Sequence, residues 1–452
     1  MIDVVADLHL HSKYSRAVSP QMIPPVMAQY GKQKGIDVLA TGDFTHPLWL
    51  REIKNYLAEE EEGLYKIKNP VAGQETTRFL LSVEIATIYS QDGKGRRIHQ
   101  VVLAPNFDVV EKINQALLKR GYNLTSDGRP ILGLASKHLL ELILEIDERS
   151  MLIPAHVWTP WFGIYGQMSG FDSLSAAFGD NEKYIYGIET GLSSDPEMNW
   201  QMKELATRSI LSFSDAHSPA KMGREATIFR LEELSYSAIC KAIMAPSKQI
   251  PTGENKVLYT IEFYPEEGKY HYSGHRNCGV TMTPEEQRIT GGVCPVCHKQ
   301  VTDGVMRRVQ ELATEKDNAV HKQNTRGLEW ISDGTHHHPP FVKIVPLQEI
   351  IAESIGSPVT SVKVKALFDT LTKTLADEFT LLLKTPLDEI TKLAGEKVAQ
   401  GIAKVRQAKI VIKPGYDGVF GVVKIWEEGK DVAKNADVPA PVDPKEQIGL
   451  QF

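Results

Sequence analysis

The chain has 452 residues, of which 42% are hydrophobic and 24% charged, and its net charge is −6. This length exceeds one ordinary core and indicates two or three domains. No apolar run approaches the ~20 residues that a membrane helix needs, and the N-terminus lacks the features of a signal peptide, so we expect a cytoplasmic protein without a membrane partner. Because the net charge is negative, any binding of nucleic acid would have to come from local basic patches.

Short apolar runs recur from residue 1 to about 235, and a longer amphipathic or loop segment follows each of them. Buried parallel strands that alternate with helices give this pattern. We therefore predict an α/β fold over residues 1–245, either a (β/α) barrel or a distorted relative of one. The runs lie at residues 4–6, 38–40, 79–81, 151–153, 184–186 and 210–211.

The composition changes twice after this region. Residues 255–310 are richer in aromatic residues, glycine and cysteine, and helical periodicity disappears there. It returns within residues 340–426 and predicts a small helical domain that ends in a strand, a turn and a strand. The tail, residues 427–452, is rich in proline and charged residues, and we expect it to be disordered.

The segment from Asp7 to His11 alternates ligand-type residues with leucines. On a strand, alternate side chains share a face, so Asp7, His9 and His11 should point the same way. A carboxylate and an imidazole share a face again at Asp215 and His217. Both patterns are typical of metal ligands.

Further ligand-type residues stand at or near the ends of the other apolar runs, where the carboxyl ends of barrel strands would meet on one rim. A single histidine beside a strand is more often a core or surface residue, but so many with acidic neighbours favour a metal cluster. Mixed histidine and carboxylate ligands suit zinc, manganese or iron and typically activate water for hydrolysis. These residues are Asp43, His46, Glu84, His156 and Glu189, together with His99, which precedes its run.

These motifs resemble the polymerase-and-histidinol-phosphatase (PHP) superfamily. The resemblance implies a distorted (β/α)7 barrel with two or three divalent ions, which we expect to be zinc, manganese or magnesium. It places His9, His11, Glu84 and Asp215 around one ion, Glu84, His99 and His156 around a second, and His46 and His217 around a third. The chain departs from the family pattern at the third site: many members have another histidine where this chain has residues 13–15, and Asp43 and His46 are not adjacent.

Within the superfamily the chain is most similar to the endonuclease Q family, over about residues 1–425. Four segments carry the resemblance, at residues 155–163, 189–200, 214–219 and 223–226. It implies a nucleoid-associated endonuclease that nicks DNA 5′ of hypoxanthine, uracil, xanthine or an abasic site, with a sliding clamp or repair proteins as possible partners. Asp215, Glu84 and His156 would act in catalysis, and Arg224 could neutralise a phosphate. A small-molecule phosphatase of the histidinol-phosphate kind and a non-enzymatic binding protein are the alternatives.

A second metal site is indicated by two knuckles, His275 with Cys278 and Cys294 with Cys297. One histidine and three cysteines at this spacing suit a structural zinc ion in a ribbon. Either His271 or His298 could replace His275, and buried thiols without a metal are the alternative interpretation.

Two segments are candidates for DNA contact. Residues 392–424 hold seven basic and two acidic residues, and Lys404, Arg406 and Lys409 are the contacts we expect, although an ordinary solvated face has equal support. Trp158, Trp161 and Phe162 follow His156 and could stack on a nucleotide beside the metals. A packed rim loop is the competing interpretation of these aromatic residues.

Overall fold

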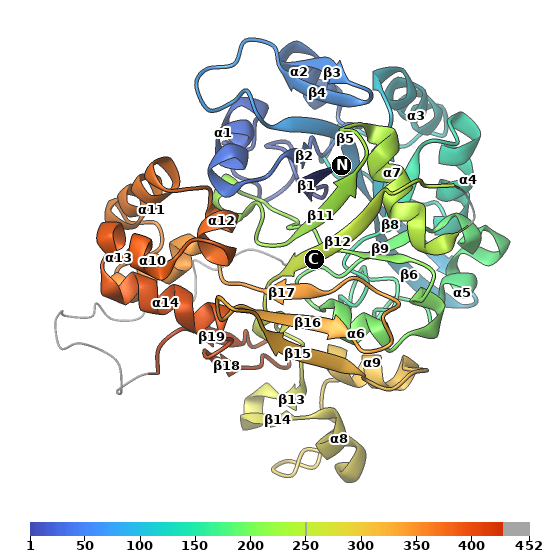
Figure 1. The fold of residues 1–452 in the computed structure, drawn as a ribbon. Coiled ribbons are helices and arrows are strands. Elements are labelled where there is room, and N and C mark those ends of the chain that lie inside the picture. The colour runs from blue at the N-terminus through green and yellow to red at the C-terminus, as the bar shows by residue number, and fades with distance from the viewer. Residues whose placement is uncertain (249–250, 428–452) are drawn as a thin grey trace.

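The computed structural model describes residues 1–248 and 251–427 (Figure 1). It is a mixed α/β fold, as the sequence predicts, and its largest sheet joins 13 strands of the described chain. None of the helices in these described ranges has the length and apolar character needed to cross a membrane. The predicted disordered tail lies, apart from residue 427, outside the described residues.

The strands that position the site surround β1. β1 pairs in parallel with β2 and antiparallel with β11, and β2 pairs in parallel with β5. β6 is antiparallel to both β5 and β8, while β9 and β10 form a separate parallel pair. The bounds are β1 Ile2–Asp7, β2 Val38–Ala40, β3 Leu57–Glu61, β4 Leu64–Ile67, β5 Arg78–Gln91, β6 Lys94–Ala104, β7 Ile131–Leu132, β8 Met151–Pro154, β9 Gly187–Glu189, β10 Ser209–Leu211 and β11 Ala226–Leu231.

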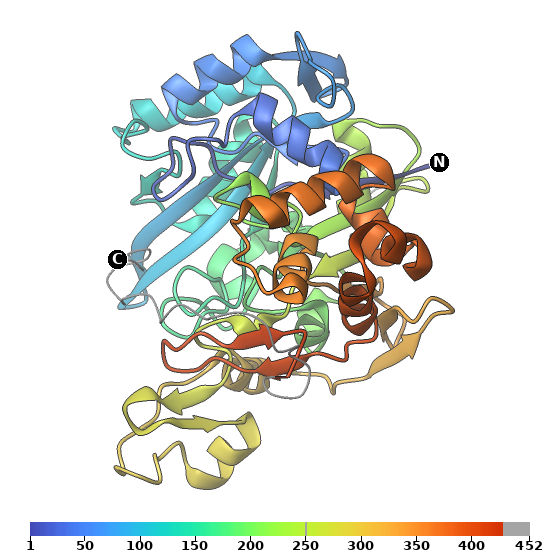
Figure 2. The same ribbon diagram turned by 90° about the vertical axis from the view of Figure 1, so that its left-hand side faces the viewer.

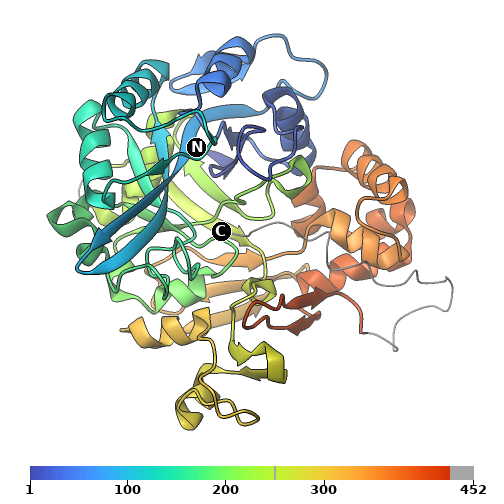
Figure 3. The ribbon, with the colours of Figure 1, turned by 180° about the vertical axis from the view of Figure 1, so that it is seen from behind.

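The strands are therefore only partly parallel, which differs from the prediction of a regular strand and helix alternation. The long hairpin of β5 and β6 is the main departure (Figure 3). It turns at Asp92 and Gly93, whose φ angles are 54° and 73°. Positive φ at both central residues gives a turn whose twist matches the flanking strands, and an Asp-Gly pair favours it.

A shared apolar core lies among these strands. Alternate residues of β1, β2, β5, β6, β8 and β11 pack in one buried cluster, together with residues of α7. Its members include Val4, Ala6, Val38, Leu80, Val101, Leu103, Ile153, Phe229 and Ile239. The opposite faces of these strands are buried in another large apolar cluster, with members such as Leu81 and Val102. Glu84 and His99 lie on the same faces as the core residues Leu80 and Val101, because alternate side chains of a strand share a face.

Helices cover the outside of this region (Figure 1). Several begin at a polar side chain that accepts a hydrogen bond from the first turn, such as Asn106 for α3 and Ser235 for α7, which stabilises the helix start. The bounds are α1 Pro24–Lys34, α2 Pro47–Tyr56, α3 Phe107–Lys119, α4 Ser136–Ile146, α5 Leu174–Phe178, α6 Pro196–Trp200 and α7 Tyr236–Met244.

The main sheet continues beyond β11 into the middle of the chain. β12 pairs antiparallel with β11, so the expected domain boundary near residue 245 falls inside a continuous sheet. β17, β16 and β15 extend the sheet further. The bounds are β12 Lys256–Glu262, β15 Ala319–Gln323, β16 Glu329–Asp333 and β17 Phe341–Lys343.

A small unit projects from the body beside the last hairpin (Figure 2). It contains the knuckle cysteines, and its own buried apolar side chains are few: Met282, Cys294 and Val301. The chain then returns to the body through α9. The bounds are β13 Ser273–His275, β14 Val280–Met282, α8 Pro284–Thr290 and α9 Val305–Leu312.

Five helices and a hairpin complete the described chain. Lys34 of α1 and Glu378 of α12 are both buried and form an ion pair of 2.7 Å, which fastens these helices to the body. The bounds are α10 Leu347–Ile355, α11 Val362–Thr374, α12 Glu378–Leu383, α13 Leu387–Ala394, α14 Glu396–Arg406, β18 Val411–Lys413 and β19 Val422–Lys424.

Candidate metal centre

Two histidines beyond the end of β1 meet two carboxylates from distant parts of the chain. His9 and His11 follow β1, Glu84 lies within β5, and Asp215 follows β10. Nε2 of His11 lies 3.2 Å from Oε2 of Glu84 and 3.1 Å from Oδ1 of Asp215. Nε2 of His9 lies 3.7 Å from Oε1 of Glu84 and 3.7 Å from Oδ1 of Asp215. The structure thus brings together the four residues assigned to the first ion.

The other side of Glu84 faces a second pair of histidines. Its Oε1 lies 2.6 Å from Nδ1 of His99 and 3.1 Å from Nε2 of His156. These two ring nitrogens are themselves 3.2 Å apart. Because Oε2 faces His11 while Oε1 faces His99 and His156, Glu84 is shared between two groups of ligand-type atoms, as a bridging carboxylate would be.

The donor set fits divalent metal ions. Within the described residues, Nε2 of His9, Nε2 of His11 and Oδ1 of Asp215 are buried and have no partner in hydrogen-bond geometry. Leaving such atoms unpaired in a protein interior is costly. In each of three groups the ligand atoms lie within 4.8 Å of one another: His9, His11 and Glu84; Glu84, His99 and His156; and His11, Asp215 and His217. Imidazole and carboxylate ligands together suit zinc or manganese.

The structure corrects the composition of the third group. His217 lies near His11 and Asp215, but His46 does not join them. Nδ1 of His46 instead accepts a hydrogen bond of 3.4 Å from the backbone of Trp49 at the start of α2, and its ring stacks on Tyr14 at 4.5 Å. His46 therefore serves as a helix cap here.

A further layer of carboxylates holds the histidine rings. Glu189 accepts hydrogen bonds of 2.9 Å from Nδ1 of His9 and from the backbone of His156. Asp43 accepts one of 3.2 Å from Nδ1 of His11. A carboxylate on Nδ1 leaves the Nε2 lone pair facing the cluster, so these residues orient the ligands rather than contact the ion. Asp7 likewise points away, toward Ser214 and Gly223.

The backbone is strained at the ends of the strands that carry the ligands. Asp43, His156 and Asp215 have φ angles of 50°, 30° and 46°, a left-handed region that residues other than glycine seldom adopt. Gly191 packs so closely that a Cβ there would lie 2.3 Å from Cβ of His156. Such strain is typically retained where function requires the side-chain position.

The two central carboxylates are anionic. Burial opposes ionisation of Glu84, but His99 and Arg129 hold its pKa well below the ordinary value. Burial also opposes ionisation of Asp215, and His9 and His11 lower its pKa in the same way. Two anionic carboxylates among histidines are the charge state that divalent ions require.

Two arginines lie beside the cluster. Arg224 donates a hydrogen bond of 3.0 Å from Nε to the carbonyl of Ser214, next to Asp215. Arg129 donates one of 2.9 Å to Oε2 of Glu84, and sequence reasoning missed it. Arg129 lies in a loop, and no periodicity or motif spacing in the sequence indicates it. The only signal nearby is Gly128, since a glycine is typical of a position where the backbone packs closely against other residues.

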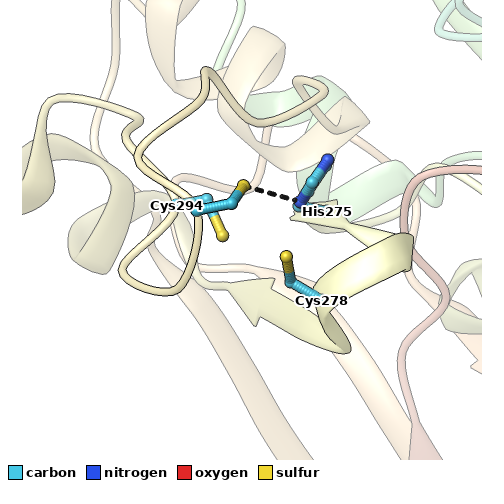
Figure 4. Close-up of side chains that lie close together, drawn as sticks. His275, Cys278 and Cys294 are labelled. Atoms are coloured by element: carbon cyan, nitrogen blue, oxygen red, sulfur yellow. Dashed lines mark hydrogen bonds between the residues drawn. The ribbon is translucent and has the colours of Figure 1, made fainter.

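The four knuckle residues converge, and Figure 4 shows three of them, His275, Cys278 and Cys294, turned toward one another. Ligand atoms of His275, Cys278, Cys294 and Cys297 lie within 4.8 Å of one another. His275 rather than His271 or His298 completes this group of described residues. Burial opposes ionisation of the Cys294 thiol, but the backbone N–H groups of Cys297 and Val296 lower its pKa to about 6, which favours the thiolate that binds metals.

The aromatic segment after His156 is mostly packed. Trp158 is 1% exposed and donates a hydrogen bond of 2.8 Å to Oδ1 of Asn199, so the prediction that it stacks on a base is wrong. Phe162 lies against the ring of His99 at 4.2 Å, and Trp161 lies under the guanidinium of Arg97 at 5.4 Å. Both are half-buried, so these two stay candidates for contact with a nucleotide.

The predicted basic surface is smaller than its sequence suggests. Lys409 is exposed, and Nζ of Lys404 lies over the ring of Trp426 at 4.6 Å. Arg406 is 3% exposed and donates to the carbonyls of Leu381, Leu382 and Thr385 at 2.9, 2.8 and 2.6 Å. It caps the end of α12 from inside the domain, so its predicted contact with DNA is wrong.

Replacing Arg406 by methionine should therefore lower stability rather than selectively weaken DNA binding. Three carbonyls lose their donor, which should cost about 2–4 kcal/mol of unfolding free energy. Lys409→Met is the matched surface variant and should leave the melting temperature unchanged. Thermal melts and DNA affinity measured for both variants test this; a stable Arg406→Met protein with weakened DNA binding would contradict the structural role.

Comparisons with known proteins agree with this arrangement. Residues 346–409 match the MJ0043 C-terminal domain family. The lesion-specific endonuclease PfuEndoQ from Pyrococcus furiosus is 29% identical, with 94% of this chain and 96% of that chain covered and a TM-score of 0.78. Endonuclease Q bound to a 27-mer duplex with an abasic lesion at the active site is 30% identical, with 94% and 98% covered and a TM-score of 0.77.

The match with one curated relative spans only part of that protein. The uncharacterized protein MJ0043 from Methanocaldococcus jannaschii is 29% identical over 296 residues, which make up 62% of this chain and 33% of that protein. The chain therefore matches about a third of the length of this archaeal relative.

Proposed function

Because the chain belongs to the endonuclease Q family, we propose that it is a metal-dependent DNA endonuclease that acts at abasic sites and deaminated bases. It hydrolyses the phosphodiester on the 5′ side of the lesion. The observation that carries this proposal is Glu84, whose two oxygens face two separate groups of histidines. Clusters of this kind hydrolyse phosphate esters, and the solved endonuclease Q complex contains duplex DNA with an abasic lesion.

The residues divide the metal-binding roles among them. His9, His11, Glu84 and Asp215 would hold one ion, and Glu84, His99 and His156 a second; His11, Asp215 and His217 form a third group. With divalent ions bound, these residues would hold a coordinated water of lowered pKa beside the phosphate, whose negative charge the ions would offset. Zinc, manganese and magnesium are the candidates. No serine or cysteine nucleophile is required.

The protein's own groups prepare the site for this chemistry. Glu189 and Asp43 fix the rings of His9 and His11 through Nδ1, so neither ring has to reorient during turnover. Phe162 packs against one side of the His99 ring. Arg224, held by the carbonyl of Ser214, provides positive charge next to Asp215 for a phosphate.

The finer architecture follows the family. Residues 1–245 close into a distorted (β/α)7 barrel, supported by the two apolar clusters in which the opposite faces of its strands are buried. Residues 255–310 hold a ribbon with one structural zinc ion on His275 and three cysteines. Residues 340–426 contribute to DNA binding, with Lys404 and Lys409 as contacts. A sliding clamp or other repair partners stay predictions from the resemblance.

Trp161 is the aromatic residue best placed to contact a nucleotide near the metals. Trp161→Ala should reduce discrimination between damaged and intact duplexes by about tenfold, since stacking on one base is worth about 1–3 kcal/mol. The comparison is the ratio of single-turnover nicking rates on abasic and undamaged DNA. An exposed aromatic far from the loop, Tyr184, gives the control variant Tyr184→Ala. Equal ratios in all three proteins would remove Trp161 from lesion recognition.

A nicking assay tests the proposed function. Duplexes carrying one deoxyinosine, one deoxyuridine, one abasic site or no lesion are incubated with Mg²⁺ or Mn²⁺, beside an Asp215→Ala control. We expect nicks 5′ of the lesion that the variant does not make. Hydrolysis of small phosphate esters without any nicking would instead support the phosphatase alternative.

A further inference from the structure

Arg129 lies at the edge of the metal cluster and has no role in the function described so far. Its Nη1 donates a hydrogen bond of 2.9 Å to Oε2 of Glu84. Its side chain is 27% exposed, whereas that of Glu84 is fully buried. One end of the guanidinium therefore contacts the shared carboxylate, and part of the side chain is open to solvent at the cluster.

The loop that carries Arg129 is fastened to the cluster from both sides. The backbone of Gly128 donates to the carbonyl of Tyr14 at 3.1 Å, and that of Ala86, two residues beyond Glu84, donates to the carbonyl of Pro130 at 3.0 Å. Oδ1 of Asp127 accepts hydrogen bonds from the backbones of Arg16 and Arg129, at 3.4 and 3.1 Å. These contacts hold the base of the Arg129 side chain in place.

Gly128 allows this close approach. A Cβ at this position would lie 2.3 Å from Oδ2 of Asp43 and 2.4 Å from Oγ of Ser15. Asp43 is the residue that orients His11, so a larger side chain at position 128 would push either the loop or His11 away. The loop therefore packs directly against Asp43, which orients a ligand-type histidine. Arg129 is the residue of this loop that brings positive charge to the cluster.

A guanidinium in this position suits a phosphate. It carries five N–H donors, and among the described residues its one side-chain hydrogen bond is to Glu84. Guanidinium groups bind phosphate oxygens through two parallel hydrogen bonds. In the cleavage of a phosphodiester, negative charge increases on the non-bridging oxygens, and a fixed donor there lowers the barrier.

We propose that Arg129 is a catalytic residue that binds a non-bridging oxygen of the scissile phosphate while its loop and Glu84 hold the guanidinium in place. This role rests on the proposed endonuclease function. It differs from charge compensation alone, in which Arg129 would only balance the charge of Glu84. In that case its loss would change metal binding, whereas a phosphate contact leaves metal content unchanged.

The test compares Arg129→Gln and Arg129→Lys with the wild-type holoenzyme, and with Arg120→Gln, an exposed arginine at the end of α3, as the matched control. Three quantities are measured: the single-turnover nicking rate on an abasic duplex, metal ions per chain, and affinity for inorganic phosphate. We expect Arg129→Gln to nick about 100-fold more slowly and to bind phosphate about tenfold more weakly. Its metal content should not change, and Arg129→Lys should be intermediate.

Two outcomes would contradict the phosphate contact, and a third would contradict only the proposed endonuclease function. Nicking and phosphate affinity within about threefold of wild type in Arg129→Gln would overturn the phosphate contact. A parallel loss of metal ions and activity would assign Arg129 to charge balance instead. If wild-type protein nicks no duplex but Arg129→Gln still weakens phosphate binding, the endonuclease function fails while the phosphate contact stands.

Discussion

Replacing Glu84 by glutamine should lower the single-turnover nicking rate by at least about a thousandfold and release both the ion placed with His9 and His11 and the ion placed with His99 and His156. Oε1 of Glu84 faces His99 and His156, and its Oε2 faces His11, so one change affects two groups of ligands. Asp215 does not reach the His99 and His156 pair. Asp215→Asn should therefore abolish activity while the second ion remains bound.

Metal content per chain, measured by elemental analysis after desalting, is determined for both variants. Glu145→Gln, an exposed position on α4, is the control and should retain full content and activity. If Glu84→Gln lost only one ion per chain relative to the wild-type protein, Glu84 would not be shared between two sites, and the arrangement derived from its two oxygens would be wrong.

Cys294→Ser should remove the zinc ion that we propose for residues 255–310, destabilise this proposed ribbon and slow nicking by about tenfold. The ribbon buries few apolar side chains of its own, so metal binding contributes much of its folding free energy. The ribbon also leads into α9, where Arg308 donates to the carbonyls of Tyr165 and Phe171 at 3.1 and 3.3 Å. These carbonyls belong to the segment that follows the ligand His156.

The measurements for this variant are zinc per chain, the thermal melt and the nicking rate. Cys240→Ala is the control, because Cys240 is buried in α7 and belongs to no metal group of the described residues; it should keep its zinc. Loss of zinc with an unchanged nicking rate would show that the ribbon does not support the active-site segment. Retention of zinc in Cys294→Ser would remove Cys294 from the ligand set.

The sequence predicted most of the residues that the structure brings together in the two clusters, because their spacing reflects local geometry. His9 and His11 alternate along an extended segment, and the knuckle residues are close in sequence, so each pattern is visible without the fold. Roles that depend on contacts between distant segments were not predictable. Asp43 and Glu189 looked like ligands, but they contact the Nδ1 side of the histidines, and only tertiary structure distinguishes the two sides of a ring.

Predictions from residue type alone were wrong where the burial of a side chain decides its role. Arg406 counts as a basic residue of an exposed face, yet its guanidinium caps α12 inside the helical region. Trp158 stands beside His156 in the sequence, yet its indole pairs with Asn199. The Asp92-Gly93 pair in the sequence favours a tight turn between antiparallel strands, and the structure has such a turn between β5 and β6. The prediction of parallel strands did not take this pair into account.

The most direct test of the central account, hydrolysis of the DNA backbone 5′ of a lesion at the Glu84 cluster, is the chemical analysis of the cut ends in ¹⁸O-labelled water. The protein is incubated with a duplex that carries one abasic site, and both fragments are examined by mass spectrometry. Attack of water on phosphorus, with the 3′ oxygen leaving, predicts a 3′-hydroxyl upstream and a 5′-phosphate with one ¹⁸O atom on the fragment that retains the lesion. A 3′ end bearing an unsaturated sugar, or a phosphate without the label, would contradict the account.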